Sequence, residues 1–522
     1  MLLSFMLRRA VELYPDKVAV CSEDLRLTYT QFGERVFQLA RHLRAVGIRK
    51  GDCLAILHVN RHEFLEAYFA AAQIGAILNP LNFRLSPREL AFILRDSRAS
   101  LLIAARRFSE QVEQLGQSET ALKKVLWVGE GDASKVIEGR DYEDALSRQS
   151  PESLPDPRIP DEEVAHLYYT SGTTGLPKGV MLTHKNVATH ALGTIAELNL
   201  TDRDVWIHVA PLFHLADAWA TFAVTWVGGR HVTVPDFDPP HVLHLIQKER
   251  VTISNMIPTM LNMLVNTEGA ASYDFSSLRA ILSGGASIAP EVVRKIMDVF
   301  KCDYIQTYGM TETSPYLTLS ILKAHLEDLN PEERFAYKAM TGRPFISVDL
   351  KVVRENGEDI RADGQEVGEI IVKGDTVTPG YWNRPEETEK AFHDGWLYTG
   401  DMAVINEERY VNIVDRKKDM IITGGENVYS TEVENVLYEH PAVLEAAVIG
   451  VPDDHWGEAV KACVVLKPGQ TATESDIIDF CKQNIAHYKS PKSVDFLEEL
   501  PKVGSGKIFK KGLRERYLKP SD

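Results

Sequence analysis

The sequence predicts an α/β protein with a large N-terminal part of several packed units and a smaller α+β C-terminal domain. Apolar residues recur at helical spacing in 64–72, which is typical of a helix that packs on a sheet. Short apolar or β-branched runs at 101–104, 125–128, 205–210 and 370–372 are typical of buried strands. The 522 residues exceed what one hydrophobic core usually organises, so about three structural units are expected.

Two changes in composition divide the chain. Residues 151–163 are rich in proline and acidic side chains, which is typical of an exposed connector. The charged run 415–419 interrupts apolar sequence on both sides. Such a run alone most often indicates a solvated turn, but about a hundred residues of alternating short strands and helices follow it. We therefore expect a first domain over 1–415 and a second domain over 416–522.

The composition excludes several classes of protein. Hydrophobic residues make up 44% and charged residues 25% of the chain, which is average for globular proteins and argues against disorder. A net charge of −16 disfavours nucleic acid as a partner. The five cysteines are scattered and form no CxxC pair, so they indicate neither a disulfide framework nor a zinc site and fit a reducing cytosol.

The sequence also predicts a cytoplasmic protein without a transmembrane segment. The first residues are apolar before they are basic, and they lack the pattern of a secretory signal peptide. No run reaches the ~18 uninterrupted apolar residues of a spanning helix, so any membrane contact would be peripheral. These patterns do not determine the oligomeric state, and a homodimer stays open.

The segment YTSGTTGLPKG at 169–179 has the composition of a phosphate-binding loop between a strand and a helix. Its glycines let backbone N–H groups converge, its hydroxyls add hydrogen-bond donors, and Lys178 supplies positive charge. It is not a Walker loop, because its glycines have the wrong spacing and Lys178 precedes Gly179 instead of Ser or Thr. The residues predicted to contact phosphate are Thr170, Ser171, Gly172, Thr173, Thr174 and Gly175.

This loop and seven further motifs, in the expected order, resemble the adenylate-forming superfamily of acyl-CoA synthetases, peptide-synthetase adenylation domains and luciferases. The resemblance spans nearly the whole chain, and it implies an enzyme that uses ATP and coenzyme A to activate a small carboxylic acid. The motifs are PLFH (211–214), SGGA (283–286), YGMTE (308–312), YTGD (398–401), DRKKD (415–419), GGEN (424–427) and PKVGSGK (501–507).

The chemistry explains why such residues are needed. A carboxylate resists attack by a thiol because its leaving group would be oxide, and reaction with ATP removes this obstacle by forming acyl-AMP and pyrophosphate. Negative charge develops around the α-phosphorus, so the site needs Mg²⁺, hydroxyl donors and lysine. The resemblance implies that Glu312 binds Mg²⁺, Thr311 contacts the α-phosphate, and Lys507, together with Lys178, assists adenylation.

The same resemblance assigns the nucleotide contacts. Tyr308 is expected beside adenine, and Asp401 is expected to accept hydrogen bonds from both ribose hydroxyls. Arg416 corresponds to the family's ribose and phosphate contact. The remaining residues expected around the nucleotide are Gly284, Gly285, Ala286, Gly309 and Met310.

A moving C-terminal domain is also implied, because Lys507 must approach ATP in the first step and the thiol needs access to acyl-AMP in the second. Lys418 occupies the family's hinge position, and Gly424 and Gly425 would face the thiol channel. One departure is Val503, which stands where threonine is common in the family, and we interpret it as tuning because Lys507 is kept.

The acid itself is less defined by the sequence. His214, Trp219 and Gly309 are candidates to line the acyl pocket, although a lone tryptophan is as often a core residue. No side chain able to recognise a second charge is obvious, which favours a largely apolar monocarboxylic acid, most simply a medium- or long-chain fatty acid. Aryl or cyclic acids stay open, as does loading of a carrier protein's phosphopantetheine. A silent nucleotide or acyl sensor would be expected to have lost Glu312 or Lys507.

Overall fold

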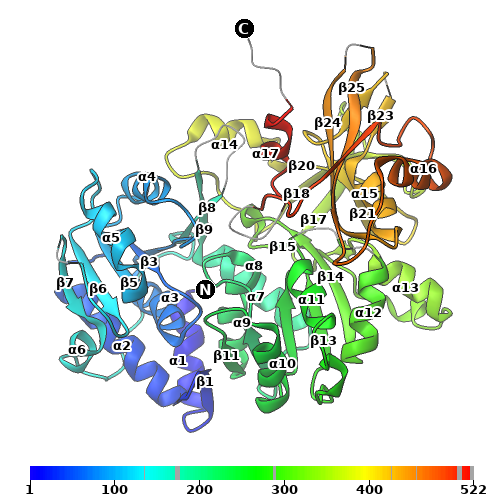
Figure 1. The fold of residues 1–522 in the computed structure, drawn as a ribbon. Helices are drawn as coiled ribbons and strands as arrows, with labels where there is room; N and C mark the ends of the chain where they lie inside the picture. Colours follow the sequence, from blue (N-terminus) through cyan, green and yellow to red (C-terminus); the bar gives the residue numbers. More distant parts are fainter. Residues whose placement is uncertain are drawn as a thin grey trace.

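The computed structural model describes residues 1–134, 136–170, 177–285, 288, 290–424, 426–453, 455–502 and 508–517. Within these ranges the strands form four sheets, with helices packed against them (Figure 1). The sheets use consecutive stretches of the chain, except that the first two strands join the second sheet. The predicted α/β class, with a large N-terminal part and a smaller C-terminal domain, is confirmed. None of the helices in the described ranges is long and apolar enough to cross a bilayer.

The first sheet has seven strands in the order β7-β6-β5-β3-β4-β8-β9 and is parallel except for the β8–β9 hairpin. The strand predictions at 101–104 and 125–128 are confirmed by β5 and β6. The strands are β3 (Cys53–Leu57), β4 (Ile77–Pro80), β5 (Leu101–Ala105), β6 (Lys124–Val128), β7 (Glu138–Asp141), β8 (Val164–Thr170) and β9 (Lys178–Thr183).

The second sheet has nine strands in the order β16-β15-β14-β13-β12-β10-β11-β1-β2, with a parallel centre and antiparallel edges. Its buried centre explains the continuous apolar run at 205–210. The strands are β1 (Val18–Ser22), β2 (Leu25–Thr28), β10 (Val205–His208), β11 (Arg230–Thr233), β12 (Ile253–Met256), β13 (Ala280–Ser283), β14 (Asp303–Gly309), β15 (Tyr316–Leu319) and β16 (Arg343–Pro344).

The third sheet is antiparallel and joins β17 (Asp349–Val353), β18 (Gly368–Lys373), β19 (Phe392–His393), β20 (Trp396–Ile405) and β21 (Val411–Arg416). The fourth sheet forms the C-terminal domain, drawn in orange and red in Figure 1, from β22 (Ile421–Thr423), β23 (Glu426–Val428), β24 (Val443–Asp453), β25 (Gly457–Leu466) and β26 (Ser493–Phe496). The charged run 415–419 therefore lies where one sheet ends and the next begins. The exact boundary between 415 and 416 stays a prediction.

The helices begin at sequence signals that satisfy their first N–H groups. Thr28 and Gln31 form a capping box before α2, and Ser86 and Glu89 form one before α4. Proline is at the first position of five further helices, where its missing N–H costs nothing. The N-terminal helices are α1 (Leu3–Leu13), α2 (Tyr29–Ala45), α3 (His62–Ile74), α4 (Pro87–Ser97), α5 (Ser109–Gly116) and α6 (Tyr142–Ser147).

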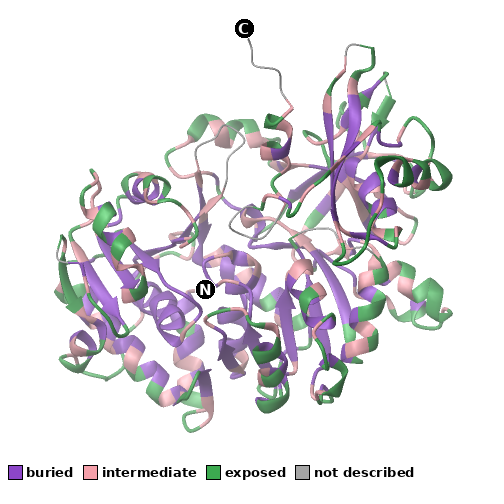
Figure 2. Ribbon diagram, in the orientation of Figure 1, coloured by how far each residue is buried: buried purple, intermediate pink, exposed green. Residues whose placement is uncertain are grey.

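Most helices that follow the β8–β9 hairpin lie against the second and fourth sheets, whereas the helix at Pro385–Ala391 packs beside β19 and β20 of the third sheet. Figure 2 shows strands of the large sheets buried and outer helix faces exposed. These helices are α7 (His184–Glu197), α8 (Leu215–Ala218), α9 (Ala220–Val227), α10 (Pro239–Lys248), α11 (Pro258–Val265), α12 (Pro290–Phe300), α13 (Pro331–Ala339), α14 (Pro385–Ala391), α15 (Ser430–Glu439), α16 (Glu474–Asn484) and α17 (Lys510–Glu515).

Candidate active site

The predicted phosphate loop connects β8 to β9. Thr170 and Lys178 are paired where the two strands meet this loop, so both lie at the same end of the hairpin. The ammonium group of Lys178 pairs with Glu387 and lies 5.3 Å from the centre of the Tyr381 ring. Five residues predicted to contact phosphate lie outside the described residues: Ser171, Gly172, Thr173, Thr174 and Gly175.

Two glycines let β14 approach its neighbours closely, Gly284 at the end of β13 and Gly309 against the backbone just before β15. A Cβ atom on Gly284 would lie 2.2 Å from Oγ1 of Thr307, and one on Gly309 would lie 1.9 Å from the carbonyl oxygen of Pro315. Neither position accepts a side chain without backbone movement. Gly284 is thus held directly beside β14, where Tyr308 follows Thr307, while Gly285 has a positive φ of 86° and Ala286 lies outside the described residues.

The carboxylate of Asp401 lies between a tyrosine and an arginine. The hydroxyl of Tyr308 donates a 2.6 Å hydrogen bond to Oδ2, and Nε of Arg416 lies 3.4 Å from Oδ1. Asp401 and Arg416 are paired across β20 and β21, which explains their proximity. Burial, and then the charge of Asp401, raise the pKa of Tyr308 well above its usual value, so the phenol stays protonated as the donor.

Glu312 lies on the short 3-10 helix η3 (Thr311–Thr313), which directly follows β14 and Met310. It is 7% exposed, and burial raises the pKa of its carboxyl group. The hydroxyl of Tyr381 donates a 2.9 Å hydrogen bond to Oε1, and no other described side chain donates to this carboxylate. A largely buried carboxylate whose negative charge is balanced by one side-chain hydrogen bond is suited to bind a cation. Mg²⁺ typically binds one or two protein carboxylates and completes its coordination shell with phosphate oxygens and water.

The acyl-pocket candidates lie around α8. His214 is the N-terminal cap of this helix, and its Nδ1 accepts a 3.1 Å hydrogen bond from the N–H of Ala216. Trp219 is 1% exposed and lies in an aromatic group with His190, Trp206 and Tyr316, whose ring centres are 5.0–5.6 Å from its own. Tyr316 begins β15, three residues after η3, so this group reaches the segment that holds Glu312.

The hinge and thiol-channel candidates lie near the start of the fourth sheet. Lys418 is exposed between β21 and β22. Gly424 has a φ of 58°, and a Cβ atom there would lie 2.8 Å from the Trp456 ring. Gly425 and Lys507 lie outside the described residues.

The structure therefore brings several predicted residues to one region between the second and third sheets. Tyr381 contacts both Glu312 and Lys178, and it is a residue that the sequence analysis did not predict, as are Glu387, Asn60 and Tyr68.

Asn60 donates hydrogen bonds to the carbonyls of His208 and Ala210 and accepts one from the N–H of Leu212, two residues before His214. Asn60 lies in the loop between the carboxyl end of β3 and α3, a place where functional loops are common in α/β proteins.

Comparison with known proteins agrees with this geometry. The family model of the AMP-binding enzymes matches residues 7–382, and that of their C-terminal domain matches residues 432–507. A feruloyl-CoA synthase of Amycolatopsis sp is 38% identical over 98% of both chains. A long-chain-fatty-acid–CoA ligase of Thermus thermophilus is 36% identical over 98% of this chain and 94% of its own.

Solved structures with the same fold cover the whole chain as well. The anthranilate CoA ligase AuaEII in complex with anthranoyl-AMP has a TM-score of 0.90 and 28% identity, covering 99% of this chain and 97% of its own. ATP-bound MatB from Rhodopseudomonas palustris has a TM-score of 0.88 and 29% identity, covering 99% of both chains. With both family models matched and relatives aligned along its length, this chain belongs to the AMP-binding enzymes of the adenylate-forming superfamily.

Proposed function

We propose that this protein is an AMP-forming acid–CoA ligase. A carboxylate oxygen of the acid attacks the α-phosphorus of ATP, forming acyl-AMP and releasing pyrophosphate. The CoA thiol, after losing its proton, then attacks the acyl carbon, and AMP leaves with the bonding electron pair. The observation that carries the proposal is that the charges of Asp401 and Lys178 both act on Glu312, and that Tyr381 contacts Glu312 and Lys178, in a chain of this family.

The nucleotide is proposed to bind between the second and third sheets. The Asp401 carboxylate would accept hydrogen bonds from the ribose hydroxyls, and Arg416 beside it would contact ribose and phosphate. Tyr308 orients Asp401 through its hydroxyl and presents its ring to adenine. The backbone of Gly284 and Gly285, held beside β14 by the absence of side chains, would border the same base.

Glu312 is proposed to hold Mg²⁺. Its burial and its single described side-chain donor, Tyr381, leave a carboxylate whose charge is incompletely balanced. Bound Mg²⁺ would neutralise charge on the phosphates as the α-phosphorus is attacked. Thr311, one residue earlier on η3, would donate its hydroxyl to the α-phosphate, and Lys178 would contribute a nearby positive charge.

The transfer of the acyl group requires a change of access to the acyl-AMP. Lys507 is proposed to assist the first step and to withdraw when the C-terminal domain rotates about Lys418. Gly424, where a side chain would collide with Trp456, is proposed to border the path of the thiol. CoA as the acceptor is supported by relatives whose names specify CoA ligases, and a carrier-protein acceptor is the alternative outcome of the test below.

The acid is proposed to be a largely apolar monocarboxylic acid, with a medium- or long-chain fatty acid as the first candidate. Relatives named as long-chain-fatty-acid–CoA ligases, at 34–36% identity, support this choice. A compact aryl acid is the second candidate, favoured by the packing of Trp219. Because that ring is held by Trp206, His190 and Tyr316, it would close the space behind His214 to a long chain.

A substrate panel tests the proposal. Purified protein with MgATP, CoA and each of a series of fatty, aryl and hydroxy acids should release pyrophosphate and AMP and form an acyl-CoA. ADP as the nucleotide product would contradict the adenylate mechanism. Transfer to a carrier protein's phosphopantetheine but not to CoA would replace CoA as the acceptor. The ratio of kcat/KM between dodecanoate and ferulate distinguishes the two acid classes.

A further inference from the structure

The last strand of the third sheet contacts the C-terminal domain through a buried carboxylate. Asp415 in β21 is 4% exposed, and its Oδ2 accepts a 2.5 Å hydrogen bond from the backbone N–H of Ser430. Ser430 is the first residue of α15, a helix that packs on β24 of the fourth sheet. The bond therefore joins a residue that precedes Lys418 in the sequence to one that follows it.

A lysine of the last helix completes this contact. Nζ of Lys510, the first residue of α17, lies 2.6 Å from the hydroxyl of Ser430 and 2.7 Å from the carboxylate of Glu434. Burial raises the pKa of Asp415, and the positive charge of Lys510 opposes that rise. We call these four residues, Asp415, Ser430, Glu434 and Lys510, the Asp415 cluster. Three of them belong to the C-terminal domain, and Asp415 belongs to the third sheet.

Both sides of the cluster are fixed to their own surroundings. Arg416, next to Asp415, pairs with Asp401, and the neighbouring Lys417 pairs with Glu369 at 3.0 Å. On the other side, Arg514 of α17 donates a 2.6 Å hydrogen bond to Asp419. The cluster thus connects the strand that holds the predicted ribose contact with the helix that starts three residues after Lys507.

We propose that Asp415, Ser430 and Lys510 are positioning residues that hold the C-terminal domain in the arrangement for acyl-AMP formation. The proposal rests on the proposed function, because it assigns the cluster to the first of the two half-reactions. The contact crosses the predicted hinge, so rotation about Lys418 would have to separate Asp415 from Ser430. A hydrogen bond to a buried charged group changes a two-state equilibrium by about tenfold to a hundredfold, which is enough to shift the balance between two arrangements.

Ser430→Pro tests the bond with little disturbance of the helix. Proline is favoured at the first helical position, and Tyr429 before it already has the extended backbone that proline requires, with φ −86° and ψ 119°. Ser430→Ala is the matched variant, because it removes the hydroxyl but keeps the N–H donor. Lys510→Met and Lys511→Met form a second pair, since Lys511 is exposed on the same helix and lies 3.9 Å from Glu515.

The two half-reactions are measured separately in the full-length protein. Single-turnover formation of acyl-AMP from acid and MgATP gives the first rate, and thioester formation from preformed acyl-AMP and CoA gives the second. Ser430→Pro and Lys510→Met should slow the first step about tenfold or more and leave the second unchanged or faster. Ser430→Ala, which loses the hydroxyl contact with Lys510 but keeps the N–H donor to Asp415, should slow the first step less than Ser430→Pro does. Lys511→Met should change the first step less than about threefold.

The outcomes separate this proposal from the proposed function. Equal slowing of both steps would indicate a merely structural role and overturn the positioning proposal, as would an unchanged first step in both cluster variants. Slowing confined to thioester formation would also overturn it. If the unmodified protein forms no acyl-AMP with any acid of the panel, the proposed function fails first. Should Ser430→Pro not fold, the lysine pair decides the question.

Discussion

The hydroxyl of Tyr308 donates a 2.6 Å hydrogen bond to Oδ2 of Asp401, although the two residues are 93 positions apart. The bond joins the end of β14 in the second sheet to β20 in the third. It orients a nearly buried carboxylate whose other oxygen faces Arg416. The proposed nucleotide site is therefore formed by two sheets that come from separate stretches of sequence.

Substitution of these two residues should weaken ATP binding to different extents. Asp401→Asn removes the charge proposed to accept the ribose hydroxyls and should raise the Kd for ATP about tenfold to a hundredfold. Tyr308→Phe removes only the orienting hydroxyl and should raise it about threefold to tenfold. Tyr398→Phe, on the same strand β20, is the control. Isothermal titration with ATP measures all three, and an Asp401→Asn variant that binds ATP normally would contradict the ribose assignment.

Glu312→Gln should separate a magnesium ligand from a structural carboxylate. The amide keeps the shape but lacks the charge that Mg²⁺ requires, so the apparent Mg²⁺ requirement should rise about tenfold or more, and acyl-AMP formation should slow by about 10²-fold. Tyr381→Phe removes the hydrogen bond to this carboxylate without removing its charge and should leave the Mg²⁺ requirement within about threefold. A Mg²⁺ titration of pyrophosphate release checks both. Equal shifts in the two variants would indicate that the Tyr381 bond, and not the charge, is the important feature.

Lys507→Ala should impair one half-reaction. Loss of a positive charge that stabilises the transition state of adenylation should slow acyl-AMP formation by at least about 10²-fold, and thioester formation from preformed acyl-AMP should survive. Lys502→Ala is the matched control, because Lys502 lies five positions earlier and pairs with Glu445 at 2.6 Å. Rapid-quench measurement of both steps decides the assignment. Comparable losses in both steps would remove Lys507 from the proposed role.

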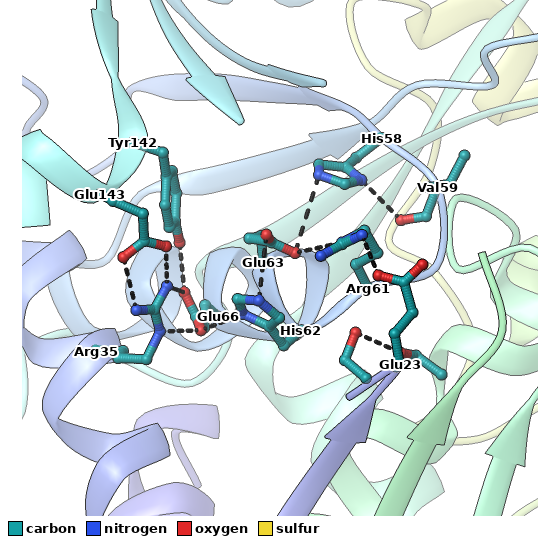
Figure 3. A network of polar contacts seen from close by, with 12 residues as sticks. Glu23, Arg35, His58, Val59, Arg61, His62, Glu63, Glu66, Tyr142 and Glu143 are labelled. Atoms are coloured by element: carbon teal, nitrogen blue, oxygen red, sulfur yellow. Dashed lines mark hydrogen bonds and ion pairs between the residues drawn. The ribbon is translucent and has the colours of Figure 1, made fainter. Parts of the chain in front are cut away.

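A buried network of charged side chains centred on Glu66 of α3 should make the free energy of unfolding depend on pH. The carboxylate of Glu66 lies 2.6–2.8 Å from Nδ1 of His62, Nε of Arg35 and the hydroxyl of Tyr142. Figure 3 shows these side chains around Glu66. Burial acts to raise the pKa of Glu66, but His62 and Arg35 outweigh it and lower that pKa to about 2. Burial likewise acts to lower the pKa of His62, but Glu66 outweighs it and the pKa is raised.

The sign of each contribution follows from these shifts. Because the folded pKa of Glu66 is depressed, its contribution is present above its unfolded pKa of about 4.5 and is lost as the pH falls toward about 2. Because the folded pKa of His62 is raised, its contribution is present below about 6.5 and is lost as the pH rises through the folded value. The network therefore stabilises the fold most between about pH 4.5 and 6.5.

Glu66→Gln tests this network. It leaves charged partners buried without their acceptor and should lower the free energy of unfolding by about 3–5 kcal/mol near pH 6. Glu143→Gln removes the exposed partner of the same arginine and should cost less than about 1 kcal/mol. Thermal melts between pH 4 and 9 measure both variants. A Glu66→Gln deficit that does not shrink at the alkaline end would contradict the assigned role of His62.

The acid–CoA ligase class could be predicted from the sequence motifs. The residues that contact the motif side chains from distant positions in the sequence could not. Asp401, Glu312 and Lys178 each lie in a string whose residue types suit phosphate or ribose. Tyr381 contacts two of them, but it lies 69 positions from Glu312 in a segment without such a string. Contacts of this kind depend on how four sheets stack, and local periodicity contains no information about that stacking.

The same reasoning explains the outcome for the fold. Strand-like runs such as 101–104 were predictable because a buried parallel strand is apolar on both faces. The antiparallel third sheet was less evident, since strands such as β20 alternate in exposure and contain a central glycine. Trp219 had two interpretations from sequence, pocket or core. Its burial among Trp206, His190 and Tyr316 agrees with a core residue. Because Tyr316 lies three residues after η3, the pocket hypothesis is still tested by the substrate panel.

Asn60 provides the last prediction, because its side chain connects the first sheet to the segment before His214. Its amide donates 3.1 and 2.8 Å hydrogen bonds to the carbonyls of His208 and Ala210, and its oxygen accepts a 2.8 Å bond from the N–H of Leu212. The hydroxyl of Tyr68 donates a further 2.8 Å bond to the carbonyl of Leu212. Backbone on the way to His214 is thus held by two side chains from one neighbouring layer.

Asn60→Ala would remove a side-chain partner from three buried backbone groups, of which the carbonyl of His208 keeps its hydrogen bond from the N–H of Val234. It should lower the free energy of unfolding by about 2–4 kcal/mol, whereas Tyr68→Phe should cost about 1 kcal/mol. The double variant should lose less than the sum, because both side chains act on the same segment. If the segment also sets the acyl pocket, Asn60→Ala should raise the KM for the acid at least threefold more than the KM for ATP. Urea titrations and steady-state kinetics check the two parts. A displaced His214 segment should disturb the acid and leave the nucleotide contacts proposed for Asp401 and Glu312 in place. Equal increases in both KM values would therefore show that Asn60 supports the whole domain and not the acid-binding side.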